Sequence, residues 1–208
     1  MTIQTDHASL VDRLLALSQY DTRVFVAITG APGSGKSTLA EALLAGIEAR
    51  LPGHAAILPM DGFHYDDGLL SARGWLARKG APHTFDADGL AATIDRLAPG
   101  DRPVAVPVFD RALEISRAGA RIIAPEVRLI LVEGNYLLLD DPAWAPLRDR
   151  FDLSVFLDVP LETLRARLEE RWKTLNPEDA RAKVEENDLP NARLVVGQSV
   201  PADLVLRA

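Results

Sequence analysis

The segment Gly30–Ser37 constrains the fold of this 208-residue chain more than any other feature. Its sequence, Gly-Ala-Pro-Gly-Ser-Gly-Lys-Ser, follows the pattern G-x-x-x-x-G-K-[ST]. The apolar run 24–28 precedes it and is typical of a buried parallel strand, because it is short, rich in β-branched residues and stops at glycine. The segment 37–50 follows it, with leucine and isoleucine at helical spacing. A strand, a glycine-rich loop and a helix in this order predict a phosphate-binding loop.

Each part of this loop suits the binding of a nucleoside triphosphate. Glycines let successive backbone N–H groups curl around phosphate oxygens, and the helix adds the positive end of its dipole. We expect Lys36 to reach the β- and γ-phosphates and Ser37 to offer its hydroxyl to Mg²⁺. The alternative is a flexible glycine-rich turn before a helix. The expected cofactors are ATP and Mg²⁺, and the expected nucleotide-binding residues are Gly30, Ala31, Pro32, Gly33, Ser34, Gly35, Lys36, Ser37 and Thr38.

The rest of the chain alternates strands and helices, which predicts a parallel sheet covered on both faces. No internal repeat or long linker divides the sequence, and its length suits one α/β domain. The sequence therefore predicts an α/β P-loop NTPase fold, with a single kinase domain over 1–208 and a small helical lid at about 165–190. Beyond the loop and its flanks, strands are expected at 55–60, 104–109, 129–132, 153–159 and 203–206, a hairpin within 111–124, and helices at 10–17, 90–97, 160–174 and 176–186, the last broken by 187–191.

Charge and composition limit the partners. The chain has 30 acidic and 23 basic residues and a net charge of −7, which disfavours a nucleic-acid backbone as partner. It has no cysteine, which excludes disulfides, thiolate metal sites and cysteine nucleophiles. The first 12 residues are polar, unlike a secretory signal, and no apolar run is long enough to span a bilayer. We expect a cytoplasmic protein with neither a nucleic-acid nor a membrane partner, and the oligomeric state stays open.

Two acidic residues follow predicted strands near the loop. Asp61 comes after the strand 55–60, and Glu133 ends the run 129–132. The carboxyl ends of parallel strands meet at the crevice where open α/β sheets bind their ligands. Asp61 can therefore accept a proton from an attacking hydroxyl or help to hold the metal, and Glu133 can coordinate Mg²⁺. The alternatives are a turn or helix-capping role for Asp61 and a surface position for Glu133.

Arg167 and Arg171 lie four residues apart on the predicted helix 160–174 and share one of its faces. Two guanidinium groups on one face can clamp a phosphoryl group during transfer and neutralise its developing charge. The alternative is a solvated charged face shared with Glu169 and Glu170.

These motifs resemble, in order, those of the uridine kinase, phosphoribulokinase and bacterial pantothenate kinase family. Asp61-Gly62-Phe63 is similar to the family's D-S-F or D-G-F segment, whose Asp is the base. The segment 78–86 resembles a substrate segment that ends in F-D or Y-D, Pro107-Val108-Phe109-Asp110 resembles the P-x-Y-D strand, and Glu133-Gly134 matches an E-G segment near the metal. The resemblance covers about 24–206 and looks closest to bacterial nucleoside or nucleotide kinase-like proteins, also called fructose transport system kinases.

The resemblance and the chemistry of the side chains together suggest an acceptor site. Asp86 can accept two hydrogen bonds from a vicinal diol, and Phe85 and Phe109 supply apolar walls. Asp86 can equally cap the helix 90–97, both phenylalanines can belong to the core, and His64 can be a packed residue. The expected substrate residues are His64, Tyr65, Arg78, Phe85, Asp86, Phe109, Asp110 and Tyr136.

The sequence thus predicts a kinase that transfers the γ-phosphoryl group of ATP to a hydroxyl of a nucleoside, sugar or similar polyol. No histidine follows Phe109, which weakens a pyrimidine nucleoside as acceptor. A nucleoside monophosphate kinase is disfavoured because Asp61 and Asp86 would repel an anionic acceptor. A GTPase-type or regulatory nucleotide-binding module is disfavoured because no N-K-x-D motif is present. The expected catalytic residues are Asp61, Lys36, Arg167 and Arg171, and the expected metal ligands are Ser37, Glu133 and Asp61.

Overall fold

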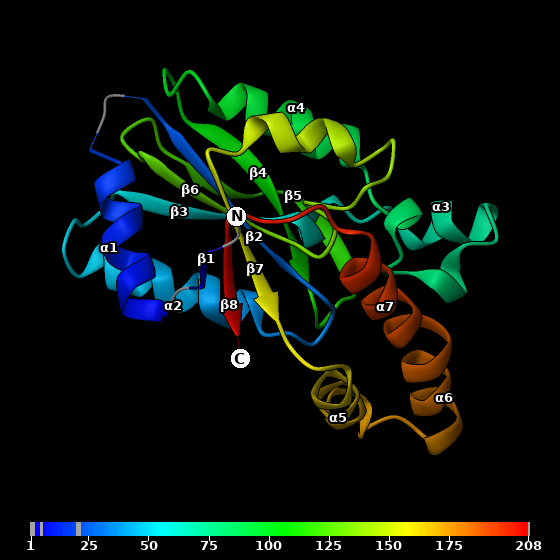
Figure 1. Ribbon diagram of the computed structural model, residues 1–208. Helices are drawn as coiled ribbons and strands as arrows, with labels where there is room; N and C mark the ends of the chain where they lie inside the picture. Colours follow the sequence, from blue (N-terminus) through cyan, green and yellow to red (C-terminus); the bar gives the residue numbers. More distant parts are fainter. Residues whose placement is uncertain (1–2, 5, 20–21, 208) are drawn as a thin grey trace.

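A computed structural model describes residues 3–4, 6–19 and 22–207. Its centre is a six-stranded sheet with the order β1-β8-β7-β2-β6-β3, in which every pair of neighbouring strands is parallel (Figure 1). The expected α/β fold with a parallel sheet is confirmed. The strands are β1 (Ile3–Gln4), β2 (Val24–Gly30), β3 (Ala55–Pro59), β6 (Leu129–Glu133), β7 (Leu153–Asp158) and β8 (Leu204–Arg207).

Helices cover both faces of this sheet, as expected (Figure 1). Successive side chains of a strand point to opposite faces, so β2 contributes to two cores. Val26 and Ile28 pack with α1 (His7–Leu17) and α2 (Lys36–Glu48). Phe25 and Ala27 face the other core, which contains residues of α4 (Ala87–Leu97), the 3₁₀ helix η4 (Ala145–Arg150) and the loop after β6.

Strands β4 (Val104–Asp110) and β5 (Ile115–Ile123) form a separate antiparallel hairpin. The expectation of a hairpin contained within 111–124 is wrong, because the strand 104–110 is one of its two arms. Most of β5 is exposed, whereas strands inside a parallel sheet are apolar on both faces. The hairpin packs against the 3₁₀ helix η1 (Met60–Phe63), where a Cβ on Gly62 would lie 2.5 Å from the carbonyl oxygen of Pro107.

Three further helices leave β7 and return towards the sheet (Figure 1). They are α5 (Leu161–Trp172), α6 (Pro177–Ala182) and α7 (Leu189–Gln198), and the π-helix η5 (Lys183–Asp188) joins the last two. The predicted break at 187–191 is wrong. The backbone widens into a π-helix instead, and Pro190 falls in the first turn of α7, where a residue without an N–H is tolerated.

Three more short helices complete the segment between β3 and α4. They are α3 (Asp67–Ala72), η2 (Leu76–Arg78) and η3 (Pro82–Thr84).

In the part of the chain that the structure describes, no helix combines the length and the hydropathy that a membrane crossing requires.

Candidate active site

The loop between β2 and α2 presents backbone N–H groups at the carboxyl end of the central strand. Gly33 and Gly35 have φ angles of 80° and 95°, in the left-handed region that glycine adopts without strain. Gly35 is the N-cap of α2, and no side chain caps this end of the helix. The N–H groups of the first turn therefore remain for a ligand, and the positive end of the helix dipole favours an anion.

Two buried charges stand beside this loop. Lys36 is 8% exposed, and its Nζ donates to the carbonyl oxygen of Ala31 at 2.9 Å. Burial lowers the pKa of Lys36 to about 8, although the nearby Glu133 and Asp61 carboxylates act in the opposite direction. Burial also raises the pKa of Glu133, and the charge of Asp61 adds to this rise. A phosphate anion would therefore meet a lysine that is poorly solvated in the free protein.

The oxygen atoms near Lys36 suit a magnesium ion. Ser37 Oγ donates to Glu133 Oε2 at 3.2 Å, and Asp61 lines the same cavity. Mg²⁺ in phosphate-transfer sites is held by one or two carboxylates, phosphates and water, so one hydroxyl and two carboxylates fit it. Across the described ranges, no group of three or more His, Cys, Asp or Glu residues gathers as a metal site.

A cavity of about 350 Å³ joins the phosphate loop to the ends of β3 and β6, the β4–β5 turn, α5 and η5. It brings together most of the residues that the sequence singled out, although Gly30, Ala31 and Ser34 of the loop do not line it. The predicted residues that line it are Pro32, Gly33, Gly35, Lys36, Ser37, Thr38, Asp61, His64, Phe85, Phe109, Glu133, Arg167 and Arg171.

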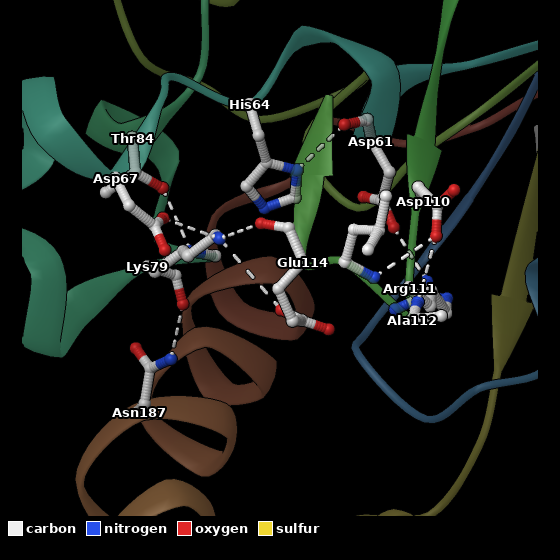
Figure 2. Close-up of polar contacts among 12 residues, drawn as sticks. Asp61, His64, Asp67, Lys79, Thr84, Asp110, Arg111, Ala112, Glu114 and Asn187 are labelled. Atoms are coloured by element: carbon white, nitrogen blue, oxygen red, sulfur yellow. Dashed lines mark hydrogen bonds and ion pairs between the residues drawn. The ribbon is translucent and has the colours of Figure 1, made fainter. Parts of the chain in front are cut away.

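Asp61 and His64 stand together at the end of β3 (Figure 2). Asp61 Oδ2 accepts a hydrogen bond from Arg111 Nη2 at 2.8 Å, and His64 Nδ1 lies 2.8 Å from the backbone oxygen of Asp61. The His64 ring packs 4.0 Å from the ring of Phe85 and 4.7 Å from that of Phe109, measured between centres. Burial lowers the pKa of His64, which favours the neutral imidazole. Its Nδ1 is the donor in this contact, because a carbonyl oxygen can only accept.

The two predicted arginines of α5 both line the cavity but make different contacts. Arg167 Nη1 donates to the carbonyl oxygen of Ser34 at 3.1 Å, which ties α5 to the phosphate loop. The guanidinium of Arg171 lies 5.1 Å from the ring centre of Trp172.

Three predicted substrate residues stabilise the fold instead of lining the cavity. Asp86 caps α4, where its Oδ1 accepts from the Gly89 N–H at 2.8 Å, the alternative that the sequence left open. Tyr136 is fully buried, its hydroxyl donates to the Gly80 carbonyl at 2.5 Å, and burial raises its pKa. Arg78 Nη2 donates to Asn191 Oδ1 at 3.1 Å and so ties η2 to α7.

Two more predicted substrate residues also lie outside the cavity lining. Asp110 shapes the β4–β5 turn, where its Oδ1 accepts from the N–H groups of Ala112 and Leu113 at 3.1 and 3.2 Å. Tyr65 is half-buried, and its backbone N–H donates to the Thr84 carbonyl. The sequence predicted that Asp61 and Asp86 together would repel an anionic acceptor. Only Asp61 lines the cavity, so this pair does not face an acceptor there.

Known proteins resemble this chain in sequence and fold. A family model described as an AAA domain matches residues 26–188. The chain is 33% identical to “Putative uridine kinase C227.14” of Schizosaccharomyces pombe, over 100% of this chain and 95% of that protein. The chain belongs to the uridine kinase family of P-loop kinases. The kinase is also 36% identical to “Uncharacterized protein YggC” of Escherichia coli, over 98% of this chain and 86% of that protein.

A solved structure gives the same result. It is described as a “putative fructose transport system kinase” from Silicibacter sp. TM1040 and is 44% identical to this kinase. The two structures superpose with a TM-score of 0.88, over 97% of this chain and 98% of the other. The expected family, the P-loop fold and the assignment as a small-molecule kinase are confirmed.

Sequence reasoning missed several side chains of the kinase's cavity. Lys79 is adjacent to the predicted Arg78, and Arg111 and Glu114 belong to the turn shaped by Asp110. An aspartate such as Asp110 commonly starts a turn, so the turn itself could have been predicted from the sequence. The sequence does not show which other segment the turn packs against. On α5 and η5 the missed residues are Trp172, whose Nε1 donates to Asp188 Oδ2 at 2.7 Å, Lys183, Asn187 and Asp188.

Proposed function

We propose that this kinase transfers the γ-phosphoryl group of ATP to a hydroxyl of a small metabolite, with Asp61 as the general base. One observation carries the proposal: Asp61, at the end of β3, lines the same cavity as Lys36 of the phosphate loop. A carboxylate so placed can take the proton of a hydroxyl while the cation faces the phosphates. The names of the relatives, a uridine kinase and a fructose transport system kinase, agree with a hydroxyl-bearing acceptor.

In this proposal five further cavity residues have a task. Lys36 and Arg171 offset the negative charge that develops on the phosphoryl oxygens, and Arg167 holds α5 on the loop. Ser37 and Glu133 supply oxygens for Mg²⁺, which would neutralise part of the phosphate charge when bound. The segment 165–190 acts as a lid that excludes water and suppresses idle ATP hydrolysis. In this proposal the reaction takes place in the cytoplasm.

A coupled ADP-release assay over nucleosides, sugars, sugar phosphates and hydroxy acids tests this function. Asp61→Asn should lower kcat for the best acceptor by about 10²- to 10⁴-fold, since a positioned base contributes that much. The KM for ATP should change little. Asp66→Asn is the matched control, because Asp66 caps α3 outside the cavity and asparagine caps equally well.

Two results would contradict the proposal. If no hydroxyl compound raises ADP release above the basal rate, the kinase reaction is wrong. If Asp61→Asn keeps the full kcat, Asp61 is not the base.

A further inference from the structure

Two cationic side chains line the cavity near Asp61 without a task in the reaction proposed above. Lys79 follows η2, and Arg111 belongs to the β4–β5 turn. Both charged groups approach one ring: Lys79 Nζ lies 5.3 Å, and the Arg111 guanidinium carbon 5.9 Å, from the ring centre of Phe109. The acceptor hydroxyl must therefore meet Asp61 beside two positive charges.

The ammonium of Lys79 is held away from water (Figure 2). Its side chain is 11% exposed, Nζ lies 2.6 Å from Asp67 Oδ1, and Nζ donates to the Glu114 carbonyl at 2.6 Å. The side chains of Asp67 and Glu114 are 47% and 57% exposed, although the Asp67 Oδ1 that meets Lys79 is itself buried. Lys79 has little access to water, so it can leave Asp67 only for another anion inside the cavity.

Arg111 occupies one carboxylate oxygen of the proposed base. Its Nη2 donates to Asp61 Oδ2 at 2.8 Å, and its side chain is 55% exposed. A neutral polyol offers Arg111 no anion in exchange for Asp61. A carboxylate or phosphate ester does, often through two parallel hydrogen bonds. An anionic acceptor would therefore bind Arg111 and free Asp61 in the same step.

The cavity as a whole suits anionic ligands, the phosphates of ATP among them. The chain as a whole is acidic, yet basic side chains outnumber acidic ones in the cavity. Asp86 and Asp110, which the sequence suggested as substrate residues, instead cap α4 and the β4–β5 turn. The charged cavity residues are Lys36, Lys79, Arg111, Arg167, Arg171 and Lys183 against Asp61, Glu114, Glu133 and Asp188.

The geometry points to an acceptor that carries an anionic group, a carboxylate or a phosphate ester, beside the hydroxyl that is phosphorylated, and assigns Lys79 and Arg111 to bind this group. This inference rests on the kinase reaction proposed above. Arg111 moves from Asp61 to the anion, and Asp61 takes the hydroxyl proton. The acceptor oxygen forms a bond to the γ-phosphorus, the bond from that phosphorus to ADP breaks, and ADP leaves.

Matched pairs of acceptors test the charge requirement. The pairs are glycerate against glycerol, ribose 5-phosphate against ribose, fructose 6-phosphate against fructose, and uridine 5′-monophosphate against uridine. We expect at least one anionic member to be phosphorylated with a kcat/KM at least about 100-fold above that of its neutral partner, as charge-assisted hydrogen bonds predict. Comparison among pairs separates carboxylate from phosphate, and ³¹P NMR of the product shows whether a hydroxyl received the phosphoryl group.

Substitutions then assign the effect to the two cations. Arg111→Gln and Lys79→Gln should each raise the KM for the anionic acceptor by about 10- to 100-fold and leave the KM for ATP nearly unchanged. Arg117→Gln is the control, because Arg117 lies on the same hairpin with the same 55% exposure but contacts Asp110 outside the cavity. A merely structural role would instead change both KM values or the melting temperature.

The outcomes separate this inference from the function on which it rests. The inference of an anionic acceptor is wrong if the best neutral acceptor has the same kcat/KM as its anionic partner. It is also wrong if Arg111→Gln changes the acceptor KM no more than Arg117→Gln does. In both cases the proposed kinase reaction remains supported. If no member of any pair raises ADP release, the kinase reaction is wrong, and the inference with it.

Discussion

At the scale of single residues, the phosphate end of the site depends on charges that the fold keeps out of water. Lys36 and Glu133 are both 8% exposed, and burial shifts their pKa values in the directions that favour the neutral forms. Holding an ammonium in such a place costs free energy that an arriving phosphate recovers. The free protein is therefore less stable than its packing alone would make it.

A substitution at Lys36 tests this conclusion. Lys36→Met should leave the melting temperature of the ligand-free protein within about 3 °C of wild type or higher, because the buried charge is removed. Saturating Mg-ATP at about 100 times its Kd should stabilise wild type by about 2.7 kcal/mol, or about 5–10 °C, and should not stabilise the variant. Differential scanning fluorimetry with and without nucleotide measures both effects. Nucleotide stabilisation of Lys36→Met equal to that of wild type would contradict the proposed role of this lysine.

At the scale of elements, the β4–β5 turn and helix α5 bring the cations to the cavity. Asp110 fixes the start of the turn through two backbone hydrogen bonds, and Glu114 has a left-handed φ of 55°. Such a conformation costs a non-glycine residue about 1 kcal/mol or more, which the contact of its carbonyl with Lys79 can offset. These contacts fix the turn that holds Arg111 over Asp61.

On α5, two arginines six residues apart face different surroundings and form a natural comparison. Arg171 lines the cavity, whereas Arg165 pairs with Glu185 outside it. Arg171→Ala should lower kcat by about 10²-fold or more, since it removes a donor for the charge on the phosphoryl group. Arg165→Ala should change kcat by less than about twofold, because exposed ion pairs contribute little. Steady-state kinetics on both variants measures the two kcat values. Equal losses of kcat would mean that the effect comes from the packing of α5.

At the scale of the whole molecule, one buried arginine joins segments far apart in the sequence. Arg23 precedes β2 and is 7% exposed. Its guanidinium donates to the carbonyl oxygens of Leu97, Ala124 and Val127 at 2.5, 2.6 and 2.8 Å. It thus ties the end of α4 and the segment after the hairpin to the amino end of the central strand.

Removing this arginine should affect stability and leave the kinetics intact. Arg23→Met leaves three carbonyl groups without their donor, so we expect a loss of about 3 kcal/mol, or about 6–12 °C in melting temperature. The KM for ATP should stay unchanged, because Arg23 lies at the opposite end of β2 from the phosphate loop. Arg102→Met is the control, since its side chain is 65% exposed. A melting temperature within about 2 °C of wild type would contradict this role of Arg23.

The sequence by itself determined the phosphate loop, the parallel α/β architecture and the family. These features are local: Gly30–Ser37 is contiguous, and the apolar strands that end near Asp61 and Glu133 are visible without knowledge of their neighbours. The same local reading identified Arg167 and Arg171, because helical spacing alone places them on one face.

Only the tertiary structure decided which charges face the acceptor. A carboxylate has the same chemistry whether it caps its own backbone, as Asp86 and Asp110 do, or points into a cavity, as Asp61 does. Lys79 and Arg111 come together only because a hairpin and a short helix distant in sequence pack around Phe109. One motif in the sequence predicts that a nucleoside triphosphate binds, whereas the charge around the proposed acceptor depends on contacts between segments that no local pattern encodes.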